Sequence, residues 1–369
     1  MFVNSVNLMD FRNFASMHAD FSKGVNIFTG NNANGKTNIL ESIYLCATTK
    51  SQKGSKDREM IAFGKEEAHI RMFITKGDIV HKVDMHLKNG NSKTVFIDGI
   101  QVNKTTGFFG LMYAVSFSPE DLLMIKNGPS LRRRFLDLEL CQLDAVYLNS
   151  FVNFNRCLDQ RNSLLRQIHL KQSNSKSLKD TISVWDEQLV KYAEVIILTR
   201  KNFIKEIEVY AADIHKKITN DKENMKLTYI PDVEPDKYME KLKEEIEKDI
   251  ILKTTGSGPQ RDDFDFEING EKARKFASQG QQRTCALSLK LAEVSFVTKK
   301  TGECPILLLD DVLSELDIYR QNKLLENING MQTFITCTGM DEFIRNRIKT
   351  EKIFKVVNGT CSEVIENTK

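Results

Sequence analysis

The spacing of apolar and polar positions divides the chain into three regions, and the first of them is typical of mixed α/β structure. A β-prone run at 25–28 leads into a glycine-containing loop, and a helix is expected to follow from 35 to 46. Alternating runs come next, at 70–74, 79–87 and 95–97, and Asn-Gly and Asp-Gly pairs punctuate them. Alternation with such turn signals predicts antiparallel hairpins.

The middle region instead has the three/four spacing of amphipathic helices. Apolar residues recur at this spacing over 136–168 and again over 185–218, with a polar stretch at 171–176 between them. Two long helices joined by a short polar loop are expected to fold back as an antiparallel hairpin. A further, strongly charged helix is predicted at 238–250.

The last region returns to an α/β pattern. Pro305 precedes an apolar strand at 306–309, which ends in two aspartates. A second strand is expected at 333–337, and residues 353–357 have the pattern of an edge strand.

Together these regions predict an α/β head of mixed sheets and helices, formed by residues 1–125 and 225–369, with a helical arm inserted at 126–224. The chain has 369 residues and a hydrophobic content of 41%, which suffices for at least one sizeable core. Its net charge of +3 neither requires nor excludes a nucleic-acid partner, because a local basic patch is what binds phosphates.

The cysteines indicate a reducing compartment. Seven are scattered along the chain, and no two have the close spacing of a metal or redox motif. The N-terminus lacks a basic stretch followed by an apolar run, so no signal peptide is expected. The purely apolar runs are only a few residues long, which argues against a bilayer-spanning helix. A cytoplasmic protein is expected.

The loop after the first strand carries the pattern GxxxxGK[ST], which predicts a phosphate-binding loop. Its glycines permit the tight turn that aims backbone N–H groups at phosphate oxygens, and the following helix presents its positive end to the same phosphates. Lys36 is expected to reach the β- and γ-phosphates, and Thr37 to ligate Mg²⁺. The candidate nucleotide-binding residues of this segment are Gly30, Asn31, Asn32, Ala33, Asn34, Gly35, Lys36, Thr37 and Asn38.

A second piece of the same chemistry is expected far away in the sequence, at the acidic end of the apolar strand 306–309. Asp310 would hold Mg²⁺, directly or through water, together with Thr37. Asp311 is placed to orient or deprotonate an attacking water. These two carboxylates and Lys36 are the predicted catalytic residues. A phosphate loop and a carboxylate strand define only a P-loop NTPase, so other segments must choose among the classes.

Two later segments resemble the dimer motifs of ABC ATPases. Residues 278–282, Ser-Gln-Gly-Gln-Gln, precede a long predicted helix and resemble the ABC signature, which binds the ATP of the opposite subunit at a helix N-terminus. Residues 314–317, Ser-Glu-Leu-Asp, resemble the D-loop that crosses the dimer interface. The order of these motifs along the chain is that of ABC proteins. The resemblance implies nucleotide contacts for Ser278, Gly280, Gln281 and Asp317.

Over essentially its whole length the sequence resembles the RecF family of ABC/SMC-type ATPases. The segments that carry this resemblance are 11–14 (Phe-Arg-Asn-Phe), 55–59, 117–122, 132–137, 258–263 and 309–311. The resemblance implies that Arg12 and Asn13 also belong to the nucleotide site. The fold that it implies is an ABC-type ATPase head, a P-loop NTPase of mixed sheets with helices, with an inserted helical arm domain.

The resemblance also implies a function. RecF proteins bind double-stranded DNA and gapped DNA where single and double strands meet, and they form a homodimer with ATP between two heads. With RecO and RecR they promote the loading of RecA in recombinational repair, replication restart and the SOS response. They are weak, DNA-stimulated ATPases in which hydrolysis acts as a switch. The expected cofactors are ATP and Mg²⁺.

Several positions depart from the ABC pattern. Asp311 stands where ABC proteins usually carry a glutamate, and its shorter side chain suits slow hydrolysis. A switch histidine is absent from the neighbourhood of Thr336 and Thr338. Ser118 or Glu120 lies about where the Q-loop glutamine belongs. The γ-phosphate sensor is therefore left unassigned.

Contacts with DNA would come from basic residues that neutralise phosphates. Charge runs are usually solvated faces, and that interpretation stays open for each candidate. The alternation of aromatic and basic residues typical of single-strand platforms is absent, which favours binding to the duplex backbone. The candidates are Lys53, Lys56, Arg58, Arg132, Arg133 and Arg134, with lysines of the arm such as Lys171 and Lys176.

Three other classes of protein stay open. A P-loop kinase for a small molecule would need a lid and has no use for the segment at 278–282. A structural SMC-like scaffold would need a longer arm. A DNA-binding module without enzymatic activity would have no need of Lys36, Asp310 and Asp311.

Overall fold

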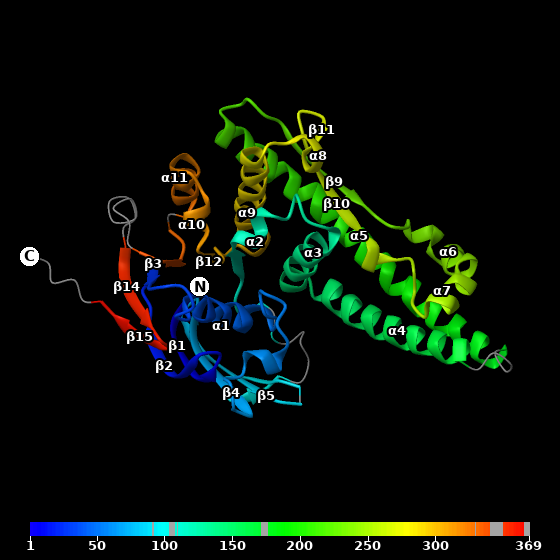
Figure 1. Cartoon of the computed structure of the whole chain (residues 1–369), viewed down its shortest axis with the longest axis horizontal. Coiled ribbons are helices and arrows are strands. Elements are labelled where there is room, and N and C mark those ends of the chain that lie inside the picture. Colours follow the sequence, from blue (N-terminus) through cyan, green and yellow to red (C-terminus); the bar gives the residue numbers. More distant parts are fainter. Residues whose placement is uncertain are drawn as a thin grey trace, which may run out of the picture. The chain divides into compact units, whose positions relative to one another are not determined.

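The computed structural model describes residues 1–90, 92–102, 108, 110–170, 176–328, 330–339 and 350–364. The chain divides into two compact units. The first, called the head, comprises Met1–Leu123 and Ala286–Lys369, and the second, called the insert, comprises Met124–Cys285. In Figure 1 the blue and red ends of the sequence both belong to the head, and the green middle of the sequence belongs to the insert.

The centre of the head is a six-stranded, mainly parallel sheet in the order β15-β14-β3-β13-β12-β8. Its strands are β3 (Val25–Thr29), β8 (Ala114–Phe117), β12 (Ile306–Asp310), β13 (Thr333–Cys337), β14 (Thr350–Val357) and β15 (Thr360–Glu363). The strands predicted at 25–28, 306–309 and 333–337 are confirmed. The prediction that 353–357 form an edge strand is wrong, because β15 pairs with the free side of β14.

The second sheet of the head is antiparallel, in the order β2-β1-β4-β5-β6-β7. Its strands are β1 (Phe2–Phe11), β2 (Phe14–Asp20), β4 (Glu67–Lys76), β5 (Ile79–Lys88), β6 (Thr94–Ile97) and β7 (Ile100–Gln101). The predicted hairpins are confirmed by the pairing of β4 with β5 and of β5 with β6. The strands β1 and β2 were not predicted from the sequence.

Helix α1 (Lys36–Thr48) packs between the two sheets, because it contacts β8, β12 and β13 of one and β4 of the other. Ile39, Leu40 and Ile43 are fully buried there, and each such side chain contributes roughly 1.5–3 kcal/mol. This packing fixes the N-terminus of α1 at the carboxyl end of β3. The remaining helices of the head are η1 (Asp57–Met60), α2 (Pro119–Leu122), α10 (Val312–Glu315), α11 (Ile318–Asn327) and most of α9 (Gln279–Thr301).

The insert is built on three helices, α3 (Pro129–Leu143), α4 (Ala145–Leu170) and α5 (Lys176–Thr219). The predicted hairpin is confirmed, since α4 and α5 pack side by side (Figure 1). The prediction of one helix over 136–168 is wrong. Asp144 interrupts it with an extended backbone, and its carboxylate accepts hydrogen bonds from the N–H groups of Val146 and Tyr147, at 2.8 and 3.0 Å. Asp144 therefore caps the start of α4.

The insert extends well beyond the hairpin. A three-stranded antiparallel sheet in the order β11-β10-β9 packs against α5 through β9. The insert therefore ends at 285, within α9, whereas the sequence placed the return to the head at 225. The helix predicted at 238–250 is two short helices that meet at Glu245. These elements are β9 (Met225–Ile230), η3 (Pro235–Lys237), α6 (Tyr238–Glu244), α7 (Ile246–Leu252), η4 (Pro259–Arg261), β10 (Asp263–Ile268), β11 (Glu271–Lys272) and α8 (Ala273–Phe276).

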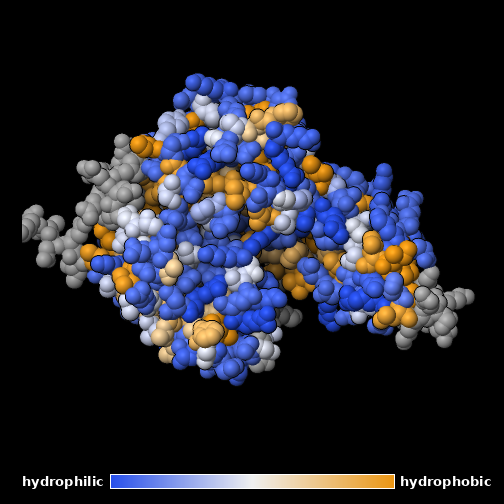
Figure 2. Space-filling model, in the orientation of Figure 1, coloured by the Kyte–Doolittle hydropathy of each residue, from blue (hydrophilic) through white to orange (hydrophobic). Residues whose placement is uncertain are grey.

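The surface is mostly hydrophilic on the face shown in Figure 2, where apolar residues form separate patches. In the described parts of the chain, no helix has both the length and the apolar character that a bilayer crossing requires. The cytoplasmic location expected from the sequence stays a prediction.

Buried arginines hold the hairpin to the loop that precedes β10. Arg200 of α5 forms ion pairs with Asp137 and Asp262, at 2.6 and 2.8 Å, and donates to the carbonyl oxygen of Pro259 at 2.8 Å. Arg161 of α4 is fully buried in a second cluster of this kind. Because a buried charge without a partner is costly, the packing of the insert depends on these partners.

Replacement of Arg200 by alanine would leave the fully buried carboxylate of Asp262 without its counter-charge. Arg200→Ala is expected to lower the free energy of unfolding of the insert by roughly 3–5 kcal/mol, as measured by chemical denaturation. The matched control is Arg166→Ala on the exposed side of α4, with an expected change within about 0.5 kcal/mol. Equal effects of the two changes would contradict a structural role for the Arg200 ion pairs.

Candidate nucleotide-binding site

The loop between β3 and α1 takes a conformation that two of its glycines make possible. Gly30 has a φ of +152° and Gly35 a φ of +108°, in the range that other residues rarely adopt. A Cβ atom on Gly30 would lie 2.2 Å from the carbonyl oxygen of Val356, and one on Gly35 would lie 2.6 Å from the Asn13 side chain. Gly35 is also the N-cap of α1, so the loop wraps the positive end of that helix.

Lys36 is nearly buried and folds back over this loop. Its Nζ donates to the carbonyl oxygens of Gly30 and Asn31, at 2.6 and 3.0 Å. A pocket of about 210 Å³ opens beside it, and a phosphate entering this pocket would offer Lys36 stronger, charged acceptors. The pocket is lined by Asn32, Ala33, Gly35, Lys36, Thr37, Asn38, Lys53, Asp311 and Thr336.

Asp310, at the end of β12, joins segments that are far apart in the sequence. Its Oδ1 accepts hydrogen bonds from Thr37 Oγ1 at 2.7 Å and from Thr336 Oγ1 at 2.9 Å. Thr336 Oγ1 in turn accepts a hydrogen bond from the N–H of Asp311 at 2.9 Å. A hydroxyl and a carboxylate oxygen in contact are ligands of the kind that Mg²⁺ takes. Thr37 and Asp310 are therefore placed where one metal ion can meet both.

Asp311 lines the same pocket, with its backbone in the left-handed region at φ 54°. Burial raises the pKa of its carboxyl group, the neighbouring Asp310 raises it further, and Lys36 opposes the rise. A raised pKa makes the ionised carboxylate a better proton acceptor. The position suits a residue that orients a water molecule and accepts its proton.

The turn between β1 and β2 supports the phosphate loop. The Asn13 amide donates to the carbonyl oxygen of Asn34 at 2.9 Å, and Asn13 Oδ1 accepts from the Asn38 amide at 2.8 Å. Arg12 binds Glu41 with two nitrogens, at 2.9 and 2.8 Å. Sequence reasoning missed Glu41, which is only 1% exposed, and its one signal is an acidic residue within the apolar run of α1. The Arg12–Glu41 pair ties the β1–β2 turn to the helix that follows the phosphate loop.

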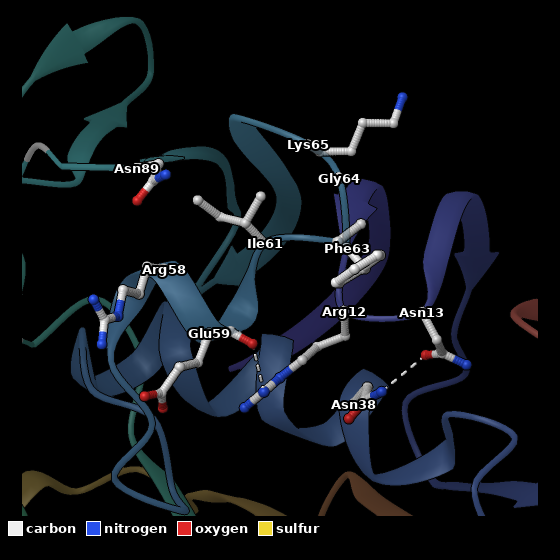
Figure 3. Close-up of a pocket in the computed structure, with 11 residues that line it drawn as sticks. Arg12, Asn13, Asn38, Arg58, Glu59, Ile61, Phe63, Gly64, Lys65 and Asn89 are labelled. Atoms are coloured by element: carbon white, nitrogen blue, oxygen red, sulfur yellow. Dashed lines mark hydrogen bonds between the residues drawn. The ribbon is translucent and has the colours of Figure 1, made fainter.

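A wider pocket of about 830 Å³ shares Asn38 with the phosphate pocket. Figure 3 shows that its lining combines charged groups, amides and one aromatic ring, that of the fully exposed Phe63. Sequence reasoning identified Arg12, Asn13 and Asn38 but missed the segment 61–65. The lining residues are Arg12, Asn13, Asn38, Arg58, Glu59, Ile61, Ala62, Phe63, Gly64, Lys65 and Asn89.

The residues predicted to form the signature begin α9 and belong to the insert. The N–H of Ser278 donates to Gln281 Oε1 at 2.8 Å, and the N–H of Gln281 donates to Ser278 Oγ at 3.3 Å. This reciprocal pair is a capping box. Gln281 Nε2 also donates to Glu223 at 2.9 Å, and Gly280 lies in the first turn of the helix. These residues are predicted to contact the nucleotide that a second copy of the chain holds.

Other predicted positions are engaged locally within the head. The Asp317 carboxylate caps α11, where it accepts from the backbone N–H of Arg320 at 3.0 Å and pairs with the same residue's guanidinium. Ser118 Oγ donates to Asp121 at 3.0 Å at the start of α2. Thr336 contacts both Asp310 and Asp311. It lies in the region where the sequence comparison with ABC proteins places their switch histidine.

Three of the candidate DNA contacts lie on α3 in the insert. Arg132 is only 3% exposed, and its guanidinium binds both carboxylate oxygens of Asp263, at 2.6 and 2.9 Å. The prediction that Arg132 contacts DNA is wrong, because its donors are occupied and covered. Arg133 donates to the carbonyl oxygen of Asp262 at 2.9 Å, and Arg134 is half-buried.

The other candidates are distributed along the chain. Lys53 lines the phosphate pocket, which makes it a candidate for nucleotide as well as for DNA. Lys56 and Arg58 are exposed, and Arg58 lines the wider pocket (Figure 3). Lys171 lies outside the described residues, and Lys176 is the first residue of α5.

Comparison with known proteins shows which family has this architecture. A family model described as the RecF/RecN/SMC N terminal domain matches residues 2–362. The DNA replication and repair protein RecF of Lachnoclostridium phytofermentans is 52% identical, over 98% of this chain and 100% of that protein. The protein of the same name from Lachnospira eligens is 51% identical, over 97% of this chain and 98% of that protein.

Solved structures show the same likeness. The recombination mediator protein RecF-ATP in the RecFOR pathway has a TM-score of 0.90 at 32% identity, covering 99% of this chain and 98% of that chain. The Smc head domain of Pyrococcus furiosus has a TM-score of 0.55 at 14% identity, covering 98% of this chain and 96% of that chain. The fold is that of an ABC/SMC-type ATPase head with an inserted helical unit. Within that class, the chain belongs to the RecF family.

Replacement of Lys36 by methionine removes the ammonium group that the pocket holds beside Gly30 and Asn31. Lys36→Met is expected to weaken ATP binding by roughly 10- to 100-fold or more, because hydrogen bonds to charged groups are worth about 1.5–3 kcal/mol. Titration with a fluorescent ATP analogue measures this. Lys88→Met, at the exposed end of β5, is the control and should bind as the unaltered protein does. Equally tight binding by both variants would contradict this placement of the phosphates.

Proposed function

We propose that this protein is an ATP-dependent DNA-binding protein of recombinational repair and replication restart, which closes as a homodimer on double-stranded DNA when ATP binds. The observation that supports this most directly is the 2.7 Å hydrogen bond between Thr37 and Asp310. It joins the phosphate loop and the acidic strand into one site for a nucleotide and a divalent ion. Relatives named DNA replication and repair protein RecF support the cellular role.

The nucleotide would occupy both pockets of the head. Its triphosphate would enter the smaller pocket, where Lys36 and the N–H groups of the loop meet the β- and γ-phosphates. Its base and ribose would extend into the wider pocket, which shares Asn38 with the smaller one. There the exposed ring of Phe63 can cover one face of the base, and Arg12 and Asn13 line the same space.

Hydrolysis would be slow and would act as a switch. When bound, Mg²⁺ would neutralise the negative charge of the triphosphate. Thr37 and Asp310 would hold it, and Asp311 would orient the attacking water and accept its proton. The Asp311 side chain is short and starts at the N-cap of α10, which limits its reach toward the water. A limited reach suits an ATPase in which the rate of hydrolysis determines when the protein is released from DNA.

The dimer would complete the site in trans. Ser278 directly precedes a helix of 23 residues, whose positive end can face the γ-phosphate held by a second copy. Gly280 and Gln281 lie in the same first turn, and Asp317 would lie at the same interface. If two heads close in this way, ATP binding joins two chains, because each nucleotide then contacts both of them.

The DNA ligand would be the duplex backbone, next to gaps in one strand. The exposed Lys53, Lys56 and Arg58 of the head, with Arg133 and Arg134 of the insert, remain candidates for phosphate contacts. The RecFOR pathway of the related RecF-ATP structure supports RecR and RecO as partners. RecA loading at gaps and a place in the SOS response follow from the same proposal.

Replacement of Asp311 by asparagine keeps the shape of the side chain and removes the proton acceptor. Asp311→Asn is expected to lower the single-turnover rate by roughly 100-fold or more, because a general base contributes about 10²–10⁴. The affinity for ATP should change little, and removal of Mg²⁺ with EDTA should abolish turnover in the unaltered protein. Glu326→Gln, on the exposed side of α11, is the control. Hydrolysis by Asp311→Asn at the unaltered rate would contradict the role of Asp311.

A mixing experiment tests the signature in trans. Ser278→Arg should bind ATP but not hydrolyse it, and Lys36→Met should stay without ATP at a nucleotide concentration below its weakened affinity. In a mixed dimer, ATP on the Ser278→Arg protomer would face the intact signature of the Lys36→Met protomer, so the mixture should regain ATPase activity. A mixture of Lys36→Met with Asp311→Asn is the control and should stay inactive, because the protomer that binds ATP lacks its base. If the first mixture is as inactive as its components, the signature does not act in trans.

A further inference from the structure

We infer that Glu223 and His215 are positioning residues for the signature segment at the start of α9, an inference that rests on the proposed function. Glu223 lies in the turn that follows α5, and its two carboxylate oxygens have different partners. Oε1 accepts a hydrogen bond from Gln281 Nε2 at 2.9 Å, and Oε2 lies 3.1 Å from His215 Nε2. One carboxylate thus clamps the last turns of α5 to the first turn of α9.

Burial and charge at this clamp agree with its hydrogen bonds. His215 is fully buried, and the Glu223 side chain is 19% exposed. Burial lowers the pKa of His215, against the influence of Glu223, so the neutral ring is favoured. Because a carboxylate only accepts hydrogen bonds, the proton of this neutral ring lies on Nε2 and is donated to Glu223. His215 and Gln281 therefore both donate hydrogen bonds to the Glu223 carboxylate.

A second residue of α9, Cys285, is also influenced by Glu223. Cys285 lies one helical turn after Gln281, on the same face of α9. Burial raises the pKa of its thiol, and the negative charge of Glu223 raises it further. The charge of Glu223 therefore acts on Cys285 as well, while its hydrogen bond to α9 is made through Gln281.

Glu223 acts on the signature segment through the Gln281 side-chain amide, which makes two hydrogen bonds. Its Oε1 accepts from the N–H of Ser278, and its Nε2 donates to Glu223. An amide held at both ends cannot rotate, so Glu223 fixes the capping box and with it the direction of the first N–H groups of α9. These groups are the ones that the γ-phosphate of a second copy would meet. Since His215 belongs to α5, the orientation of the signature also depends on that helix.

The test compares Glu223→Ala with Glu223→Gln, which keeps an acceptor for Gln281. Glu223→Ala is expected to leave the affinity of the monomer for a fluorescent ATP analogue unchanged, because the phosphate loop belongs to the head. The dimer dissociation constant, read from the dependence of ATPase activity on protein concentration, should rise about tenfold, with an unchanged KM for ATP. Glu223→Gln should restore most of the activity. Glu206→Ala, on the exposed side of α5, is the matched control.

The outcomes separate this inference from the function on which it rests. If the unaltered protein shows no ATP-dependent dimer, the proposed function and this inference both fail. If it does, and Glu223→Ala dimerises equally well, only the inference is overturned. A parallel loss of ATP affinity and thermal stability in Glu223→Ala, without rescue by Glu223→Gln, also overturns it. Should Glu223→Ala fail to fold, Glu223→Met fills the same volume without an acceptor and carries the same test.

Discussion

The site depends on the parallel pairing of β3, β13 and β12, because this pairing brings the carboxyl ends of three distant segments to one edge of the sheet. Thr336 of β13 lies opposite Phe28 on one side and Asp310 on the other. In this register the Asp310 carboxylate meets the hydroxyls of Thr336 and Thr37. A slip of one residue would turn Asp310 to the opposite face of the sheet and remove both contacts. The acid therefore has to be the last residue of an otherwise apolar, fully buried strand.

The phosphate loop is held in shape before any ligand enters. Its glycines adopt backbone angles that other residues rarely take, and α1 is fixed by burial between two sheets. Asn34 donates to the carbonyl oxygen of Val356 at 3.1 Å, and Asn13 holds Asn34 from the other side at 2.9 Å. A loop constrained in this way does not have to be ordered when a nucleotide binds, so less of the binding free energy is lost.

Local patterns predicted the features whose causes are local. Lys36 and Thr37 lie within the phosphate-loop pattern, and Asp310 directly follows an apolar strand, so the spacing within each short segment is sufficient to predict a phosphate site and a carboxylate strand. The hairpin of α4 and α5 was predicted for the same reason. The break at Asp144 was missed, because one polar residue within a helical spacing does not by itself reveal that its carboxylate caps the next helix.

Features that depend on distant partners were not predicted. The run of three arginines that Arg132 opens predicts a DNA contact, and nothing in the sequence reveals that Asp263 pairs with Arg132. The extent of the insert was underestimated for a similar reason, since the packing of β9 on α5 decides it. Glu41 and Glu223 are single acids whose roles appear only through Arg12 and Gln281.

The proposed function requires that nucleotide binding joins two copies of this chain. Sedimentation of the unaltered protein, alone, with ATP and EDTA, and with ATP and Mg²⁺, measures this. A monomer is expected in the first two conditions and a dimer in the third. A monomer in all three conditions would rule out the ATP-dependent dimer, and a P-loop enzyme that works as a single chain would then fit the site better.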